Sequence, residues 1–224
     1  MSTTAIHPAY VGRYIDQGKI IPLPLSDRDL KRQEEHVKAV LDTFDFKKQR
    51  YGLLISLMSQ GVTFLPFELA LMRQGMICCN CDDSPYEAGR IESILRRFDP
   101  AFTAGVTAQV LDGIKAAGFD QDKLFADSMV WAKPDAYERL KSVPGIRLLR
   151  WLELGPALAL ECRFHHGAHI SDREWKVEEE NGELLITSRL DRATPITRLK
   201  TGIRGTVTYE PCPCGHPGAR IIVG

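Results

Sequence analysis

The stretch 51-YGLLISLMSQGVTFLPFELALMRQGMICCNC-81 decides the fold class. Two short apolar runs, 51–58 and 76–81, have the length of buried strands. Between them, 64–75 has the length and apolar content of a helix, and Gly75 is a typical residue for ending one. A strand, a helix and a second strand in this order predict two parallel strands joined by a helical crossover.

The same alternation continues after this stretch. Residues 84–98, SPYEAGRIESILRRF, predict an amphipathic helix with proline just inside its start. Residues 101–107, AFTAGVT, predict a strand, and 108–118, AQVLDGIKAAG, predict a helix that ends at Gly118. Strands and helices that alternate at this spacing predict an α/β fold in which helices cover both faces of a parallel sheet.

The N-terminal flank has a different character. Residues 1–25 contain several proline and glycine residues, and we expect them to be irregular. A helix is expected to begin at Ser26, because serine is a favourable N-cap, acidic residues follow it, and apolar residues recur at helical spacing.

The C-terminal flank is dominated by strand signals after about residue 145. The pair Asn181-Gly182 separates two strand-like runs and predicts a tight hairpin. We therefore expect an α/β layer at 1–148 and a β-rich part at 149–224. The two parts can pack as a single domain.

The composition argues against several classes of protein. The 29 basic and 29 acidic side chains cancel, so no general attraction to nucleic acid or to an anionic membrane is expected. No apolar run reaches the roughly 18 residues that a membrane span needs. Residues 1–10, MSTTAIHPAY, lack the basic start and apolar stretch of a secretory signal. We expect a cytoplasmic protein of one or two domains.

Six cysteines need an explanation other than disulfides, which are rare in the cytoplasm. Cys78, Cys79 and Cys81 belong to an apolar run and are interpreted as reduced core residues without a metal. Successive side chains of a strand point to opposite faces. We therefore expect Cys79 and Cys81 on one face and Cys78 on the other.

The remaining three cysteines lie close to histidines and predict a metal site. Cys212 and Cys214 stand on one short turn, and Cys162 and His169 supply a second ligand pair seven residues apart. Two pairs on two turns are typical of a structural Cys₃His zinc site. A metal-free cysteine cluster and a hydrolytic zinc assisted by Glu161 stay open as alternatives. The rival ligands are His165, His166 and His216.

Three stretches of the β-rich part resemble a known family. They are ECRFHHGAHI (161–170), NGELLITSRLDRATPITRLKTG (181–202) and CPCGHPGARI (212–221). They resemble the phenylacetate–CoA ligase branch of the adenylate-forming superfamily, which reads E-C-x₆-H, G-E-L-x-x-T-x-L…P-[LI]-x-R-Y-x-T-G-D and C-x-C-G-R. The resemblance implies zinc on the matching Cys, His, Cys and Cys, and it favours His169 over the two preceding histidines.

The resemblance also implies a substrate site. LELGP (152–156) is similar to the family's E-x-G-P, which makes Glu153 the counterpart of a magnesium-binding glutamate. Arg198 matches an arginine that the ligases use near the nucleotide. These two residues are the catalytic candidates. The ligand-binding candidates are Gly105, Val106, Gly155, Pro156, Thr201 and Gly202.

The sequence departs from the family pattern where the nucleotide is held. Ser2-Thr3-Thr4, which resembles the end of the phosphate loop, has no glycine to let backbone N–H groups approach a phosphate. Ile203 stands where an aspartate is expected to hold the ribose. Leu199 and Leu149-Arg150 replace a tyrosine and a Tyr-Gly pair. The chain ends at Gly224, so we expect it to lack the mobile C-terminal domain and the lysine that assists adenylation.

These observations lead to one main hypothesis and two alternatives. We expect a degenerate homologue, a pseudoenzyme, that binds an aryl or acyl carboxylate or its CoA thioester, without efficient ATP and magnesium chemistry. It is also expected to self-associate or to act as a partner subunit. The first alternative is an ATP-dependent acyl- or aryl-CoA ligase completed by a separate subunit. The second is another reaction on the same scaffold, such as thioester hydrolysis or acyl transfer.

Overall fold

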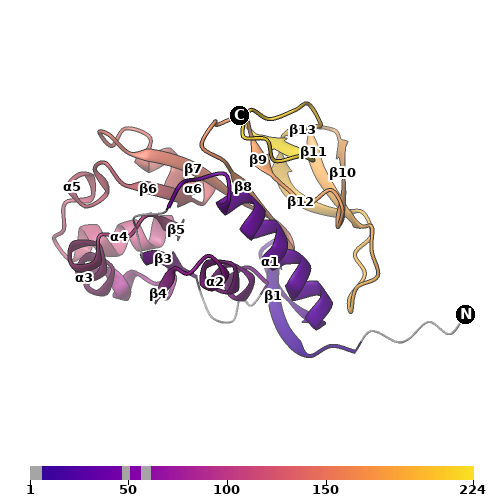
Figure 1. The fold of residues 1–224 in the computed structure, drawn as a ribbon, viewed down its shortest axis with the longest axis horizontal. Coiled ribbons are helices and arrows are strands. Elements are labelled where there is room, and N and C mark those ends of the chain that lie inside the picture. The colour runs from indigo at the N-terminus through magenta and orange to yellow at the C-terminus, as the bar shows by residue number, and fades with distance from the viewer. Residues whose placement is uncertain (1–6, 47–50, 57–61) are drawn as a thin grey trace, which may run out of the picture.

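A computed structural model describes residues 7–46, 51–56 and 62–224. An α/β part and a β-rich part lie side by side, and helix α1 (Asp27–Leu41) runs along their junction (Figure 1). Nine strands of the described residues form one sheet across both parts. In spatial order they are β13 (Thr206–Thr208), β14 (Arg220–Ile222), β9 (Ala168–His169), β8 (Ala157–Glu161), β7 (Arg147–Leu154), β6 (Met129–Ala132), β5 (Thr103–Val106), β3 (Tyr51–Ile55) and β4 (Ile77–Cys81).

The sheet is parallel in one half and antiparallel in the other. Strands β4, β3, β5, β6 and β7 pair in parallel, as the alternation of strands and helices predicts. From β7 to β13 each neighbouring pair is antiparallel. The sheet as a whole is therefore mixed, not parallel, because Gly155-Pro156 makes a two-residue turn between β7 and β8 in place of a helical crossover. Strand β7 also crosses the boundary at residue 148 that the sequence predicts between the α/β part and the β-rich part.

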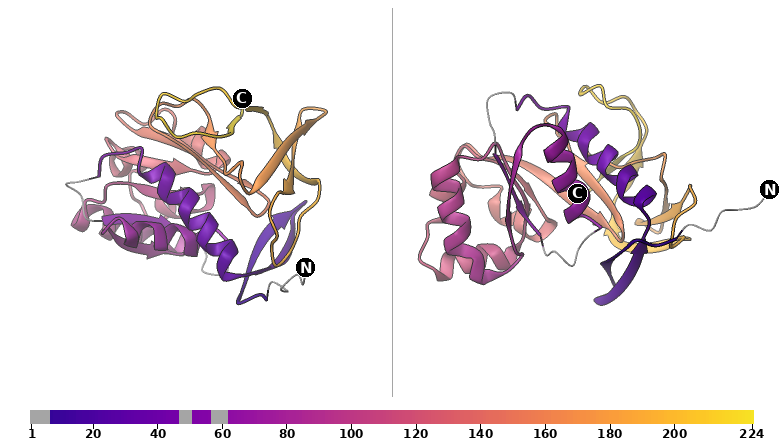
Figure 2. Two further views of the ribbon diagram at one scale, coloured as in Figure 1. Left: turned by 45° about the vertical axis from the view of Figure 1, so that its right-hand side comes forward. Right: turned by 60° about the horizontal axis from the view of Figure 1, so that its bottom comes forward.

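Helices cover both faces of the parallel half, as expected (Figures 1 and 2). Leu54 packs with α1 and α2 on one face, while Leu53 and Ile55 pack with α3, α4 and α6 on the other. This alternation follows from the two-residue period of a strand. The helices other than α1 are α2 (Phe64–Arg73), the 3₁₀ turn η1 (Pro85–Glu87), α3 (Ala88–Phe98), α4 (Ala108–Ala116), α5 (Gln121–Phe125) and α6 (Pro134–Leu140).

A smaller three-stranded sheet packs on the antiparallel half. Its strands are β10 (Trp175–Glu180), β11 (Glu183–Ser188) and β12 (Leu199–Arg204). Trp175 and Leu184 share an apolar cluster with Leu152 of β7. The predicted hairpin between β10 and β11 is confirmed, since Asn181 and Gly182 at its turn have φ values of 54° and 77°.

The expectation that residues 1–25 are irregular is wrong over 10–25. Strands β1 (Tyr10–Asp16) and β2 (Lys19–Leu25) form a hairpin closed by Gln17-Gly18, both with positive φ. The two prolines of β2 hide this strand in the sequence. They are tolerated because β2 pairs with β1 alone among the described strands. The Ser2-Thr3-Thr4 segment lies outside the described residues.

Helix α1 begins where the sequence predicts, with a capping box. The Ser26 hydroxyl accepts from the backbone N–H of Asp29 at 3.2 Å, and the Asp29 carboxylate accepts from that of Ser26 at 2.9 Å. The same carboxylate accepts from the Ala193 N–H at 3.2 Å. Burial alone raises the pKa of Asp29, but these hydrogen bonds and the charge of Arg192 outweigh it and lower that pKa.

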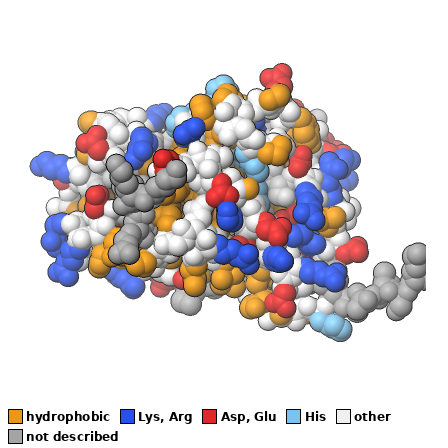
Figure 3. All heavy atoms as spheres, viewed as in Figure 1, with side chains coloured by type: hydrophobic (Ala, Val, Ile, Leu, Met, Phe, Trp, Pro, Cys, Tyr) orange, Lys and Arg blue, Asp and Glu red, His pale blue; other side chains and the backbone are white. Residues whose placement is uncertain are grey.

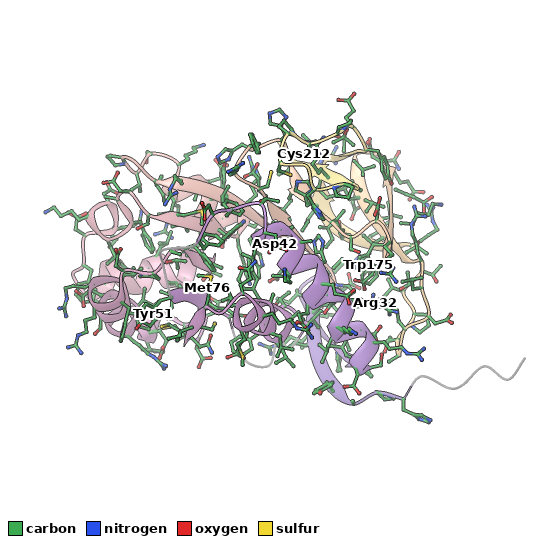
Figure 4. The ribbon with its side chains drawn as sticks, viewed as in Figure 1. Arg32, Asp42, Tyr51, Met76, Trp175 and Cys212 are labelled. Atoms are coloured by element: carbon green, nitrogen blue, oxygen red, sulfur yellow. The ribbon has the colours of Figure 1, made fainter. Side chains whose placement is uncertain are left out.

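Arg192 links this helix start to the smaller sheet. Its Nη1 donates to Glu174 Oε2 at 2.6 Å, and its Nε lies 3.5 Å from Asp29 Oδ1. The guanidinium also stacks on the Trp175 ring, 4.3 Å from the ring centroid. Arg32 and Trp175, labelled in Figure 4, mark this junction. Side chains of Arg192, Asp29 and Glu174 are at most 2% exposed, so the network is buried.

Charged side chains of both signs are interspersed over the visible face of the molecule (Figure 3), which agrees with a net charge of zero. No helix among the described residues has both the length and the apolar content needed to cross a membrane.

Replacing Arg192 by methionine is expected to lower the free energy of unfolding by about 3 kcal/mol, because two buried carboxylates lose their buried cation and keep only Arg32. Urea denaturation measures this. The matched control is Arg198→Met, which removes exposed ion pairs with Glu178 and Glu180 and is expected to cost about 0–1 kcal/mol. Equal effects of the two substitutions would show that the buried network does not hold α1 in place.

Candidate metal centre and ligand crevice

The structure brings Cys162, His169, Cys212 and Cys214 together. Cys162 follows β8, His169 ends β9, and the two other cysteines lie in the loop between β13 and β14. Hydrogen bonds from the N–H of His165 to the Cys162 carbonyl and from that of Gly215 to the Cys212 carbonyl shape the two turns. The four ligand atoms all lie within 4.8 Å of one another. Cys212 is labelled in Figure 4, above the upper end of α1.

The spacing of the donor atoms fits a tetrahedral zinc site. Zinc–sulfur bonds of about 2.3 Å and zinc–nitrogen bonds of about 2.05 Å imply S···S and S···N separations near 3.8 and 3.6 Å. Cys162 Sγ and Cys212 Sγ are 3.7 Å apart, and Cys214 Sγ is 3.3 Å from His169 Nε2. Three thiolates and one imidazole fill four positions, which is the donor set of a structural site.

The electrostatics of the cluster also suit a cation. Burial, with a contribution from the neighbouring sulfur of Cys212, raises the pKa of Cys162 to about 12. A divalent cation would offset this cost of ionising closely spaced thiols. Burial, together with His216, His36 and Arg220, lowers the pKa of His169 to about 3. Its imidazole is therefore neutral near pH 7, which is the form that binds metals.

The rival histidines lie outside this cluster of donor atoms. His165 is half exposed, and its Nδ1 is 3.5 Å from Glu161 Oε2. The same Glu161 oxygen accepts from the backbone N–H of Arg150 at 3.0 Å, so it is engaged away from the four ligands. The His216 ring packs against that of His169 with centroids 4.8 Å apart and a tilt of 50°, and the backbone N–H of His216 donates to Cys214 Sγ at 3.4 Å. His216 thus supports the ligands without joining them.

The first group of cysteines is divided between two faces of β4, as predicted. Cys79 and Cys81 pack with the cluster of α3 and α4, and Cys78 packs with that of α2. All three are free thiols. Burial raises the pKa of Cys78 and of Cys81 to about 12, which disfavours reactive thiolates at these two positions.

A second polar cluster lies at the carboxyl ends of the parallel strands. Asp83 follows β4, Thr107 follows β5, Lys133 follows β6, and Glu153 lies near the end of β7. Open α/β sheets bind ligands in the crevice outside these strand ends. We refer to these four residues as the crevice cluster.

Lys133 is the centre of the crevice cluster. Its ammonium lies 3.1 Å from Glu153 Oε1 and 3.9 Å from Asp83 Oδ2. Thr107 Oγ1 donates to Asp83 Oδ1 at 2.5 Å, and Trp151 Nε1 donates to Glu153 Oε1 at 3.0 Å. Lys133 and Asp83 are 15% and 8% exposed. Sequence reasoning missed Lys133, because its contacts arise only when β4, β6 and β7 lie in the same sheet.

Two predicted ligand-binding residues directly precede Thr107 of the crevice cluster in sequence. Gly105 has a φ of 84°, and a Cβ at this position would lie 2.2 Å from the Ile55 carbonyl oxygen. The strand register shifts here, so glycine has a backbone role. Val106 is fully buried in the core on the α4 side. Its side chain therefore packs between sheet and helix.

The remaining predicted site residues lie further along the chain. Gly155 and Pro156 form the β7–β8 turn, where the Pro156 carbonyl accepts from Gln33 Nε2 at 3.2 Å. Thr201 Oγ1 donates to the Leu184 carbonyl at 2.8 Å inside the smaller sheet, and Gly202 follows it. Arg198 pairs on the surface with Glu178 and Glu180. Of the catalytic candidates, Glu153 alone belongs to the crevice cluster.

Solved structures share this arrangement of strands and helices. The open form of 2-hydroxyisobutyryl-CoA ligase, in complex with 2-HIB-AMP and CoA, aligns over 99% of this chain with a TM-score of 0.71 and 12% identity. A malonyl-CoA ligase with methylmalonyl-CoA and AMP bound aligns over 97%, with a TM-score of 0.59 and 14% identity. Coronafacic acid ligase from Pectobacterium brasiliense aligns over 82%, with a TM-score of 0.54 and 17% identity. The chain therefore shares its fold with part of these acyl-CoA ligases.

The likeness is confined to part of these enzymes. The chain covers 57% of the 2-hydroxyisobutyryl-CoA ligase, 53% of the malonyl-CoA ligase and 39% of the coronafacic acid ligase. No protein-family model matches the sequence, and no curated protein is detectably similar to it. At these identities the comparisons establish the fold alone.

The freshly purified protein is expected to contain about one zinc ion per chain, measured by elemental analysis. Cys162→Ser is expected to lose the metal and to lower Tm by about 5 °C or more, since about 1 kcal/mol shifts Tm by 2–4 °C at this size. Cys78→Ser is the control and should keep the zinc, because Cys78 lies outside the cluster. Wild-type protein without any transition metal would contradict the assignment.

Proposed function

We propose that this chain is a degenerate homologue of the phenylacetate–CoA ligase branch, a pseudoenzyme that binds an acyl or aryl carboxylate or its CoA thioester. Zinc on Cys162, His169, Cys212 and Cys214 would stabilise its β-rich part. The single observation that carries the proposal is the crevice cluster with Lys133 at its centre.

The charges of the crevice cluster favour acyl ligands over a nucleotide. One ammonium and two carboxylates leave a net negative charge, which repels a triphosphate. The Lys133 ammonium also lies between the two carboxylates that a magnesium ion would need. A thioester carbonyl is neutral and can accept a hydrogen bond from Lys133 without this repulsion. A carboxylate can do so by replacing Glu153, which is 28% exposed.

The β-rich part supports the same proposal. Ile203, at the position where the ligases are expected to hold a ribose, packs against the apolar cluster of the smaller sheet. An isoleucine there provides no acceptor for a hydroxyl group. Loss of a hydrogen bond to a charged group costs on the order of 1.5–3 kcal/mol of binding. Nucleotide affinity should be correspondingly weak.

The ligands of the solved ligases indicate which compounds to test. The 2-hydroxyisobutyryl-CoA ligase binds 2-HIB-AMP and CoA, and the malonyl-CoA ligase binds methylmalonyl-CoA and AMP. An acyl group, a CoA moiety and an AMP moiety are common to both, and the negative charge of the crevice cluster disfavours the last. We therefore propose small acyl-CoA thioesters and their parent acids as the ligand class of this chain.

A thermal-shift screen with aryl and aliphatic acids, acyl-CoA thioesters, CoA, AMP and ATP is expected to show stabilisation by an acid or a thioester. A ligand at 100 times its Kd stabilises by about 2.7 kcal/mol. Lys133→Met should abolish the shift, whereas Lys123→Met, on exposed α5, should not. Stabilisation by ATP alone, or a shift unchanged in Lys133→Met, would contradict the proposed site.

A second candidate function is an ATP-dependent acyl-CoA ligase completed by a partner subunit. The observation that favours it is an apolar outer face on the β1–β2 hairpin, where Val11, Ile15 and Ile20 are 71%, 61% and 59% exposed. Exposed apolar groups gathered on one element are typical of protein interfaces. In this case the partner would supply the groups that position and neutralise the phosphates.

Acid-dependent ATP–pyrophosphate exchange distinguishes the two candidates. The isolated chain is expected to show none above background, because positioning and charge stabilisation are what phosphate chemistry depends on. The same assay is repeated with cell extract from the source organism to supply a partner. Exchange by the chain alone, above that of Arg198→Ala, would overturn the pseudoenzyme proposal. Exchange that appears only with extract, and that is lost when the exposed apolar residues Val11, Ile15 and Ile20 of the β1–β2 hairpin are replaced, would favour the ligase.

A further inference from the structure

A pocket lies at the amino ends of the parallel strands, on the opposite edge of the sheet from the crevice cluster. It has a volume of about 380 Å³, within the range of about 300–1,000 Å³ for small-molecule sites. Met129 and Leu149 line it near the amino ends of β6 and β7, and Phe44 and Phe46 line it from the segment after α1. We propose that this pocket binds an amphipathic anion, an apolar body that carries one carboxylate, sulfonate or phosphate group.

The pocket has an apolar interior of packed aromatic rings. The rings of Phe44 and Phe46 are stacked with centroids 5.5 Å apart and an interplanar angle of 14°. Phe44 and the buried Trp131 form an edge-to-face pair with ring centroids 5.1 Å apart. The ring centroids of Phe46 and Phe102 are 5.3 Å apart. Met129 and Leu149 are buried in the same core cluster. An aromatic ring or a short alkyl chain would therefore meet a preformed surface, which lowers the entropic cost of binding.

The rim of the pocket is cationic. Arg147 begins β7 on the same face as Leu149, and Arg163 lies in the loop after β8. Neither guanidinium has a carboxylate within ion-pair distance in the described part of the chain. Asp45 is the acidic residue of the lining, so two arginines face one carboxylate. Arginine is well suited to bind carboxylate and phosphate groups through two parallel hydrogen bonds.

This pocket is distinct from the proposed acyl site. Met129 begins β6 and Lys133 follows its end, so the length of the strand, roughly 10 Å, separates them. The two sites also differ in charge, because the crevice cluster has an excess of carboxylates and the pocket has an excess of guanidinium groups. Binding at one site can thus be tested independently of binding at the other.

The test is isothermal titration of the zinc-loaded protein with 1-naphthoate, naphthalene-1-sulfonate, 1-naphthyl phosphate and octanoate. The uncharged control ligand is 1-naphthalenemethanol, which keeps the naphthyl ring and lacks the anionic group. In the Lys133→Met variant, which removes the proposed acyl site, we expect saturable one-site binding of at least one anion and at least tenfold weaker binding of the alcohol. The double variant Arg147→Gln, Arg163→Gln should raise Kd about 10- to 100-fold, the loss expected for charge-assisted hydrogen bonds. Preference for naphthoate over octanoate would identify a flat body as the better fit.

The matched control is Arg150→Gln. Arg150 is on the same strand but stacks on Tyr137, 4.1 Å from the ring centroid, on the other face of the sheet. Its substitution should leave Kd unchanged, as should Lys133→Met. The proposal is overturned if no anion binds up to about 1 mM, or if the double variant binds as tightly as wild type. Binding lost in Lys133→Met but kept in the double variant would overturn this pocket while supporting the proposed acyl site.

Discussion

The pairing of β7 on both of its edges is the constraint on which the other features depend. It is parallel to β6 on one side and antiparallel to β8 on the other. A strand enclosed in this way must satisfy its backbone hydrogen bonds in two different patterns and present apolar side chains to both faces. Its sequence, RLLRWLEL, meets this demand with buried residues at positions 148, 149, 151, 152 and 154. The α/β part and the β-rich part therefore cannot separate without breaking one sheet.

The same strand positions all three sites of interest. Arg147 at its start stands at the rim of the apolar pocket, and Glu153 near its end pairs with Lys133. The Gly155-Pro156 turn then reverses the chain into β8, which ends one residue before the zinc candidate Cys162. The buried Arg192 network fixes α1 across this junction. A shift of β7 by one residue would exchange its faces and displace every one of these groups.

Local sequence signals predicted the parts of this structure that short-range forces decide. Ser26 as a helix cap and Asn181-Gly182 as a hairpin turn depend on backbone geometry within four residues. Each of the two turns presents a pair of zinc candidates, which is a local property, but the two pairs meet only because β9 pairs with β14. The β1–β2 hairpin was missed, although Gln17-Gly18 lies between strand-like residues, because two prolines outweighed that signal. The contacts of Lys133 depend on sheet order and could not be read from spacing.

The zinc candidates and the apolar pocket share one segment of chain. Arg163 and His165 line the pocket, and both lie between the ligands Cys162 and His169. A metal ion that fixes both ends of this segment restricts the positions open to the Arg163 guanidinium. Ordering a long cationic side chain otherwise costs up to about 2 kcal/mol of conformational entropy. Metal binding would already restrict the Arg163 side chain, so less conformational entropy is lost when the anion binds. Metal and anion should therefore bind cooperatively, and by linkage each strengthens the binding of the other by the same factor.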